Sequence, residues 1–226
     1  LLGRFKFNVL IRSVMRISHL FILLAASAML TACDFLDEYN PNSVTVGNYY
    51  TSEEDIVASL NGVYTSLTQS YVADNYHYFT DVRANATVVT NSGANSGIPY
   101  QFYNYTLTEE NVYVYNRYSQ LYKIISRANT LFAHLGDVSY ATPSARDTYE
   151  AEARFLRALS YYWLVTEWGD VPLVLKVLES TEEVRANNYR RPKAEIYQAI
   201  FDDLKYVTES PLLDVQPASA CGKVSK

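Results

Sequence analysis

The chain is organised around one amphipathic stretch, from Glu150 to Leu173, which predicts one long helix. Apolar residues recur every three or four positions, as the buried stripe of a helix requires: Ala151, Phe155, Leu156, Ala158, Leu159, Tyr162, Trp163 and Val165. The predicted polar face carries Glu152, Arg154, Arg157 and Ser160. Glu150 lies four residues before Arg154, as in a helical ion pair. Gly169 suits a left-handed cap and Pro172 stands where a helix cannot continue, so we expect a central helix that ends there.

Three further helices are predicted by the same periodicity. The first follows Ser52, whose acidic successors suit a capping turn, and its apolar face comprises Ile56, Leu60, Val63, Tyr64 and Leu67. The second spans 112–135, with an apolar face of Val114, Tyr118, Leu121, Ile125, Ala128, Phe132 and Leu135. The third follows Pro192, which suits a first helical position, and presents Ile196, Tyr197, Ile200, Leu204 and Val207. An extended segment and then a charged loop are predicted between Pro172 and Arg191.

Two residues interrupt these helical patterns. Gly62 lies inside the first helix, where glycine costs ~1 kcal/mol relative to alanine. It either permits a close helix crossing or is a tolerated surface position. Asn129 lies on the packed face of the second helix, where we expect a buried amide that neighbouring backbone groups satisfy.

Residues 70–111 show no clear period and are predicted to form long irregular loops. They contain many aromatic side chains and a polar insert, NSGANSG, at 91–97. Long loops are often binding loops, and tyrosine combines a flat apolar face with a hydroxyl, which suits sugar rings. The candidate ligand contacts are Tyr76, Tyr78, Asp81, Arg83, Asn91, Asn95, Tyr100 and Tyr103. The alternative is that these rings only pack the loops against the helices.

The first 32 residues are typical of a bacterial export signal. Arg12 and Arg16 precede a short apolar run, and Leu30-Thr31-Ala32-Cys33 follows it. A basic region, an apolar region and small residues before a cysteine predict a lipoprotein signal peptide over residues 1–32, with Cys33 lipidated. An ordinary secretory signal with an incidental cysteine is the alternative. Met15 is a plausible start, which would make residues 1–14 an overextension, and residues 33–50 are expected to be a lipidated tether.

The charge of the chain argues against a nucleic-acid partner. The formal net charge is −5, and residues 1–32 contribute four basic residues and no acid. The remaining chain therefore carries a net charge of −9, whereas phosphate binding needs a basic face. Cys221 is the only cysteine besides Cys33, so no disulfide is expected within the mature chain.

Several segments resemble the SusD/RagB family of nutrient-uptake lipoproteins. The family's signature helix and exit turn are similar to EARFLRA at 152–158, YY at 161–162 and WGDVPL at 168–173. Further similarity lies in Cys33–Asp37, in Tyr50-Thr51 with Asn61–Tyr64, in Arg127–Asn129, and in Arg191 with Ile196–Leu204. The resemblance covers residues 33–226.

This resemblance implies an all-α fold of tetratricopeptide-like helix pairs with long irregular loops, incomplete at the C-terminus. Residues 51–226 would be a truncated N-terminal helical domain, because family members are about twice this length or more. The implied protein is a non-enzymatic lipoprotein on the outer membrane. It would bind a glycan, or alternatively a peptide, and hand it to a TonB-dependent SusC-like transporter. The early acids after Cys33 resemble signals for export to the cell surface.

Catalytic and cofactor motifs are not visible in the sequence. There is no glycine-rich phosphate loop or nucleophile elbow, and too few histidines and cysteines remain for a zinc site, so neither cofactor nor metal is expected. A glycoside hydrolase would need two opposed carboxylates, for which Asp81 and Glu109 are the candidates. Asp202 and Asp203 could form a metal site or an acid pair, but a solvated helix face is the simpler interpretation. A helical scaffold that binds only protein remains a further alternative.

Overall fold

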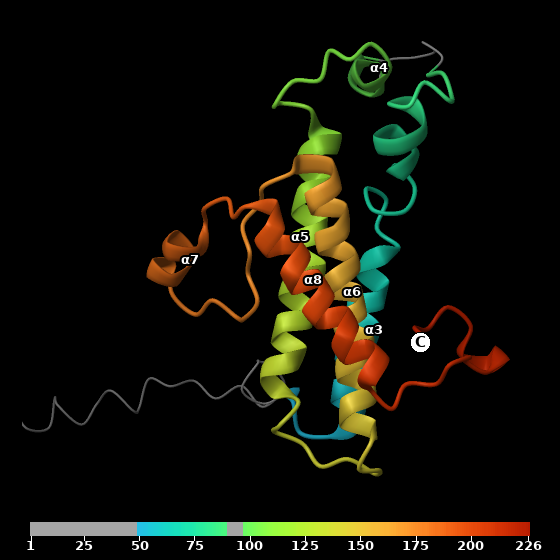
Figure 1. The fold of residues 1–226 in the computed structure, drawn as a ribbon, viewed down its shortest axis with the longest axis vertical. Helices are drawn as coiled ribbons and strands as arrows, with labels where there is room; N and C mark the ends of the chain where they lie inside the picture. The colour runs from blue at the N-terminus through green and yellow to red at the C-terminus, as the bar shows by residue number, and fades with distance from the viewer. Residues whose placement is uncertain (1–48, 90–96) are drawn as a thin grey trace, which may run out of the picture. The chain divides into compact units, whose positions relative to one another are not determined.

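The computed structural model describes residues 49–89 and 97–226, and these residues form helices joined by turns (Figure 1). The elements are α3 (Glu53–Leu67), the π-helix η2 (Tyr78–Val82), α4 (Gly97–Tyr103), α5 (Val112–His134), α6 (Ala145–Trp168), α7 (Thr181–Asn187), α8 (Lys193–Glu209) and the 3-10 helix η3 (Ala218–Ala220). In this part of the chain, β pairing is limited to one bridge between Val171 and Arg191. The predicted all-α fold is confirmed.

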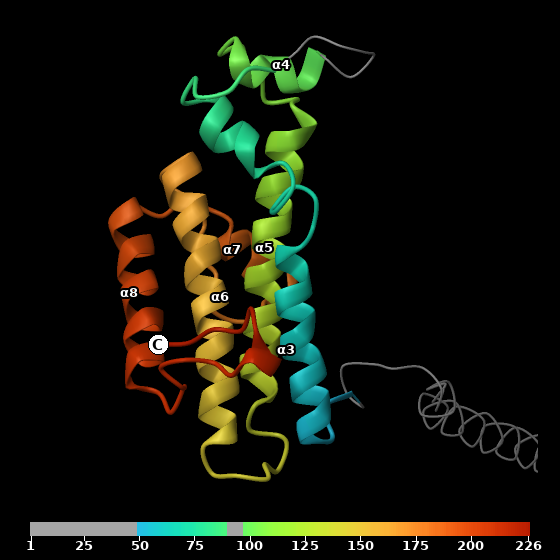
Figure 2. The ribbon, with the colours of Figure 1, turned by 90° about the vertical axis from the view of Figure 1, so that its right-hand side faces the viewer.

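Helix α6 contacts both α5 and α8 and lies between them, as Figure 2 shows. It also contacts α3, which packs against α5. The main core therefore contains side chains from all four helices, including Leu60, Leu121, Ile125, Leu156, Leu164 and Ile196. No helix within the described residues is long and apolar enough to span a bilayer. The prediction of a central helix at 150–168 is confirmed, and α6 begins five residues before the predicted start at Glu150.

The polar face that the sequence predicts for α6 is largely buried, which corrects that prediction. Glu152, Arg157 and Ser160 are 3%, 5% and 0% exposed, respectively. Tyr162, which the pattern assigns to the apolar stripe, is instead 49% exposed. The reason is that α8 packs on α6 from the side that carries Arg157, so polar groups there bind across the helix interface instead of meeting water.

Arg157 joins three helices and the segment after α6. Its Nε and Nη2 atoms donate to the two carboxylate oxygens of Asp203 in α8, at 2.8 and 2.7 Å. Its Nη1 donates to Oδ1 of Asn129 in α5 at 2.7 Å and to the Leu175 carbonyl at 3.2 Å. Arg154 adds a second guanidinium to Asp203 at 2.8 Å. Asp203 is 2% exposed, so the predicted solvated helix face is wrong for Asp203 and holds only for exposed Asp202.

Three local predictions are confirmed, two of them at helix ends and one inside α5. Asp55 accepts hydrogen bonds from the backbone N–H and hydroxyl of Ser52 at the start of α3, both at 2.9 Å. Asn129 donates to the carbonyls of Val174 and Lys176, which confirms the buried amide. Gly169 ends α6 with a φ of +76°, a conformation that glycine adopts without strain.

Two segments that were predicted to be loops contain helical turns. Residues 70–111 include η2 and α4, and the predicted charged loop after Pro172 includes α7. The sequence does hold a signal for α7, because Ser180 and Glu183 have capping-box spacing. Ser180 Oγ accepts from the Glu183 N–H at 3.1 Å, and Glu183 accepts from the Glu179 N–H at 2.9 Å. The short helices η2 and α4 have no such signal in the sequence. They are stabilised by packing on each other and on α5.

The segment after α8 returns to the bundle. Leu212 and Val224 are buried together with Val207 and Ala151. The Val224 N–H donates to the Tyr64 hydroxyl at 3.0 Å, and that hydroxyl donates to Glu152 at 2.7 Å. The last residues of the chain therefore pack on α3 and α6, which lie more than 50 residues earlier.

The structure decides between the two roles considered for Gly62, which were a close helix crossing and a tolerated surface position. A Cβ atom built on Gly62 would meet no atom within 4 Å, so no crossing requires the glycine. We expect Gly62→Ala to raise the free energy of unfolding by about 0.5–1 kcal/mol, because alanine loses less backbone entropy in a helix. Gly169→Ala is the control, since its φ of +76° makes a side chain unfavourable there. Chemical denaturation measures both, and a destabilised Gly62→Ala variant would contradict the assignment.

Glu152 gives the fold a defined dependence on pH. Burial raises the pKa of the Glu152 carboxyl above its usual 4.5, although the Tyr64 hydrogen bond and the Lys223 charge oppose this. Because the folded state then holds this proton more tightly than the unfolded state, the group's contribution to stability falls as pH rises above 4.5 through the raised pKa.

We therefore expect Glu152→Gln to gain stability relative to the wild type as pH rises from 4.5 to 7, because glutamine still accepts the Tyr64 hydrogen bond without the desolvated charge. Urea unfolding over this pH range is the measurement. Glu54→Gln, on the exposed face of α3, is the control. A stability difference that is constant with pH would rule the explanation out.

Candidate functional site

The aromatic residues of η2, α4 and the start of α5 form a second core beyond the main bundle. We call it the aromatic end: Phe79, Val82 and Phe102 are buried, and Tyr78, Tyr103, Leu107, Tyr113, Val114 and Trp168 pack around them. The Phe79 and Phe102 rings meet edge to face with centroids 4.9 Å apart, and Tyr78 and Tyr113 do so at 5.3 Å. Such geometry adds to area burial. Packing is therefore the role of most rings in this segment.

Arg117 is the charged centre beneath the aromatic end. Its side chain is fully buried on α5 and forms a bidentate ion pair with Glu167 on α6, with both N–O distances at 2.6 Å. Its Nη1 also donates to the carbonyls of Tyr71 and Val72, at 3.1 and 3.2 Å. These carbonyls belong to the turn that leads into η2, so one guanidinium ties that turn to both long helices.

Three aromatic rings surround the same guanidinium. The Cζ atom of Arg117 lies 4.9 Å from the ring centroids of Tyr76 and Phe79, and 5.5 Å from that of Trp163. Cation–π attraction of this kind strengthens when the cation is shielded from water. Trp163 is only half-buried, but its ring covers the ion pair and contributes to the main core.

A hollow of about 170 Å³ opens beside this ion pair, between the C-terminal end of α6 and the aromatic end. We call it the Trp168 hollow, and it is lined by Phe79, Arg83, Leu107, Thr108, Val114, Glu167 and Trp168. It combines aromatic walls with a carboxylate, a guanidinium and a hydroxyl. Ligand pockets pair apolar walls with a few fixed polar groups in this way.

The structure distributes the sequence-predicted ligand residues over different environments. Arg83 is the one that lines the Trp168 hollow. Tyr76 packs on Trp163 and Arg117, and half-buried Tyr78 packs on Phe102 and Tyr113. Tyr100 and Tyr103 pack on each other with tilted rings whose centroids are 5.6 Å apart, and Asp81 is exposed.

The remaining candidates lie elsewhere. Asn91, Asn95 and Cys33 are outside the described residues. Asp81 and Glu109, the candidate hydrolase pair, are both exposed, and neither lines the Trp168 hollow. Among the described residues, no group of three acidic, histidine or cysteine side chains could hold a metal ion.

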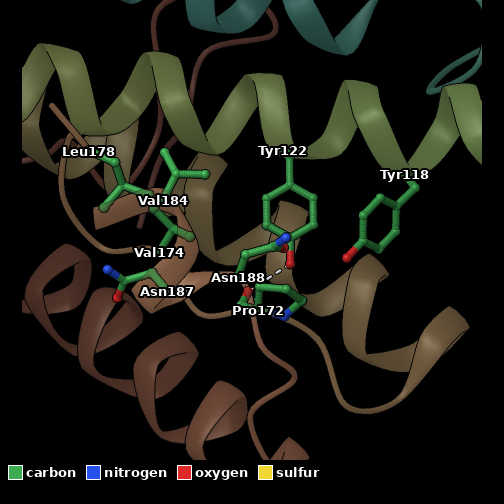
Figure 3. A pocket seen from close by; sticks show the side chains of 8 residues that line it. All are labelled: Tyr118, Tyr122, Pro172, Val174, Leu178, Val184, Asn187 and Asn188. Atoms are coloured by element: carbon green, nitrogen blue, oxygen red, sulfur yellow. Dashed lines mark hydrogen bonds between the residues drawn. The ribbon is translucent and has the colours of Figure 1, made fainter. Parts of the chain in front are cut away.

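A second hollow, of about 150 Å³, lies between α5 and the segment after α6 (Figure 3). Its lining residues are Tyr118, Tyr122, Pro172, Val174, Leu178, Val184, Asn187 and Asn188. The Tyr122 hydroxyl donates to the Pro172 carbonyl at 2.7 Å, so it fixes the wall of the hollow. Most of the lining is apolar. Sequence reasoning missed this hollow and Glu167 alike, because each collects residues from segments far apart in the chain.

Comparison with known proteins gives a consistent result. Residues 34–213 match a family model described as SusD-like, starch-binding and associating with the outer membrane. SusD-like protein P2 of Formosa agariphila is 27% identical over 181 residues, which cover 80% of this chain and 35% of that protein. A SusD-like protein of Bacteroides ovatus is 25% identical, with 85% and 35% covered. The chain thus spans about a third of the length of these relatives.

Solved structures agree with the sequence matches. A laminarin-binding SusD-like protein superimposes with a TM-score of 0.69 at 27% identity, covering 78% of this chain and 38% of that one. The NanU protein of B. fragilis superimposes with a TM-score of 0.60 at 22% identity, covering 76% and 33%. At that identity the second match supports the fold alone.

Proposed function

Because the family match extends over residues 34–213, the chain belongs to the SusD-like family of outer-membrane-associated proteins, and we propose that it binds an oligosaccharide for nutrient uptake. The resemblance recognised from residues 152–173 is thereby confirmed. The similar laminarin-binding protein supports a glycan as the ligand. The family match is the observation that carries the proposal.

The aromatic end is the part of this chain that we assign to the ligand. Exposed and half-buried tyrosine rings, including Tyr76, Tyr78, Tyr100 and Tyr103, offer apolar faces, and Asp81 and Arg83 offer hydrogen-bonding groups. Asn91 and Asn95 remain proposed contacts. The Trp168 hollow and the hollow of Figure 3, at about 170 and 150 Å³, are each smaller than the ~300–1,000 Å³ of a complete ligand pocket. Each is therefore suited to part of a longer ligand.

Binding without catalysis fits the charges at the aromatic end. Glu167, the carboxylate that lines the Trp168 hollow, is neutralised by Arg117 through two short hydrogen bonds. Glycoside hydrolysis needs two opposed carboxylates, whereas the lining of the Trp168 hollow contains one, that of Glu167. We propose that the chain is a binding protein and that delivery to a TonB-dependent, SusC-like transporter is its role.

Calorimetric titration of the chain with laminarin and with soluble starch tests the ligand assignment. We expect saturable binding to at least one of these glycans. A mixed-sequence peptide library is the parallel measurement, because a peptide-binding member of the family is the alternative. A chain that binds peptides and neither glycan would contradict the proposal, and a chain that binds neither class while capturing the transporter would favour a protein-binding scaffold.

Membrane attachment through Cys33 is a separate part of the proposal. The supporting observation is the sequence Leu30-Thr31-Ala32-Cys33 after a basic and apolar stretch. We expect Cys33→Ala to move the protein from the membrane fraction to the soluble fraction of the cell, because acyl chains would supply the membrane affinity of an acidic protein. Cys221→Ala is the matched control, since Cys221 is the exposed cysteine of the described residues. Membrane association that survives Cys33→Ala would disprove the anchor.

A further inference from the structure

We propose that the Trp168 hollow is a subsite for one pyranose ring, with Glu167 as the hydrogen-bond acceptor, Arg83 and Thr108 as hydrogen-bonding partners, and Trp168 as a wall. This inference rests on the proposed function, because it names where one sugar of the glycan binds. The observations that support it are the lining of the hollow, the ion pair that fixes the Glu167 carboxylate and the hydrogen bond that holds the backbone of Arg83.

The walls of the hollow suit the apolar face of a sugar. Trp168, Phe79, Leu107 and Val114 line it. The Trp168 ring is itself fixed, since it meets Tyr118 edge to face with centroids 5.3 Å apart and packs on Phe79 at 6.1 Å. A pyranose presents C–H groups on one face and hydroxyls around its edge, so it can contact such a wall and still reach polar groups at the rim.

The polar groups of the hollow are complementary to sugar hydroxyls. Each Glu167 oxygen accepts one hydrogen bond from Arg117 and keeps a further lone pair. Within residues 49–89 and 97–226, the Arg83 guanidinium makes no hydrogen bond or ion pair, so its donors are available to a ligand hydroxyl. A hydroxyl both donates and accepts, and it can therefore join the carboxylate to the guanidinium.

The Glu167 carboxylate and the backbone of Arg83 are each held by a contact that lies outside the hollow. Arg117 holds the Glu167 carboxylate by its bidentate pair and is fully buried, so this acceptor cannot turn away. On the other side, the Tyr105 hydroxyl donates to the Arg83 carbonyl at 2.8 Å. Tyr105 has a φ of +58°, an unfavourable conformation for a tyrosine that the surrounding structure must maintain. Arg117 is thus a positioning residue for the subsite.

Variants of exposed residues in the hollow test the subsite without disturbing the core. Arg83→Ala and Thr108→Val each remove a polar group from an exposed side chain. In titrations with laminarin and soluble starch, we expect about tenfold weaker binding for Arg83→Ala and about threefold for Thr108→Val, as expected for hydrogen bonds with and without a charged partner. Arg185→Ala on exposed α7 controls for lost charge, and Asn188→Ala controls for the hollow of Figure 3.

Tryptophan emission gives a second measurement at the subsite. The chain has two tryptophans, Trp163 and Trp168, and only Trp168 lines the hollow. We expect glycan binding to change the emission of the wild type and not that of Trp168→Phe, which keeps a ring in the wall. A change that persists in Trp168→Phe would overturn the subsite.

Arg117→Lys tests the positioning role, because lysine keeps the charge but loses the bidentate geometry. We expect a variant that still unfolds cooperatively by circular dichroism yet binds the same glycans at least tenfold more weakly, with the emission change reduced. Wild-type affinity in a folded Arg117→Lys variant would overturn the role of Arg117.

The outcomes separate this inference from the proposed function. If the wild type binds laminarin or starch and both Arg83→Ala and Thr108→Val bind as tightly, the subsite is wrong and the proposed function stands. If Asn188→Ala alone weakens binding, the ligand occupies the hollow of Figure 3 instead. If the wild type binds neither glycan, the proposed function fails and the subsite fails with it.

Discussion

The guanidinium of Arg157 is the contact on which the arrangement of the helices depends. A buried guanidinium is expensive unless its N–H groups are satisfied, and here Asp203, Asn129 and the Leu175 carbonyl satisfy them. These partners lie on α8, on α5 and in the segment after α6. If any of the three moved, a buried donor or acceptor would lose its partner, so this one group restricts how the helices can pack.

Arg117 plays a comparable part near the other end of α6. Glu167 lies ten residues beyond Arg157 in the sequence, about 15 Å along the helix axis at 1.5 Å per residue, and Arg117 binds it while also holding the carbonyls of Tyr71 and Val72. Arg157 thus connects helices to one another, whereas Arg117 connects an irregular segment to the helices. The geometry of the aromatic end depends on the contacts of Arg117. The ion pair of Arg117 with Glu167 in turn requires α5 and α6 to be held side by side.

This division of roles between the two arginines fits the proposed function in ligand binding. The four long helices supply a rigid frame, and the residues assigned to the ligand lie on short helical turns that aromatic packing and one ion pair attach to it. Polar groups near a ligand are useful only when they are held in place. Around the Trp168 hollow, Arg117 holds the acceptor and Tyr105 holds the backbone of Arg83, and each does so from outside the hollow.

The sequence by itself determined the features that depend on local spacing. The apolar periods at 53–67, 112–134 and 193–209 and the cap at Gly169 are set by neighbours within a few residues or by the 3.6-residue turn. The same period places Asn129 on the packed face of its helix, but the hydrogen-bond partners of its amide lie 28 to 47 residues away. The motif at 152–173 likewise identified the family. Tertiary structure decided the rest: α8 turned the polar side of α6 into an interface around Arg157, and α5 and α6 brought Arg117 to Glu167. Arg157 and Asp203 are 46 residues apart in the sequence, and Arg117 and Glu167 are 50 residues apart. A helical pattern in the sequence shows only which face of a helix is polar, not which partner will cover that face.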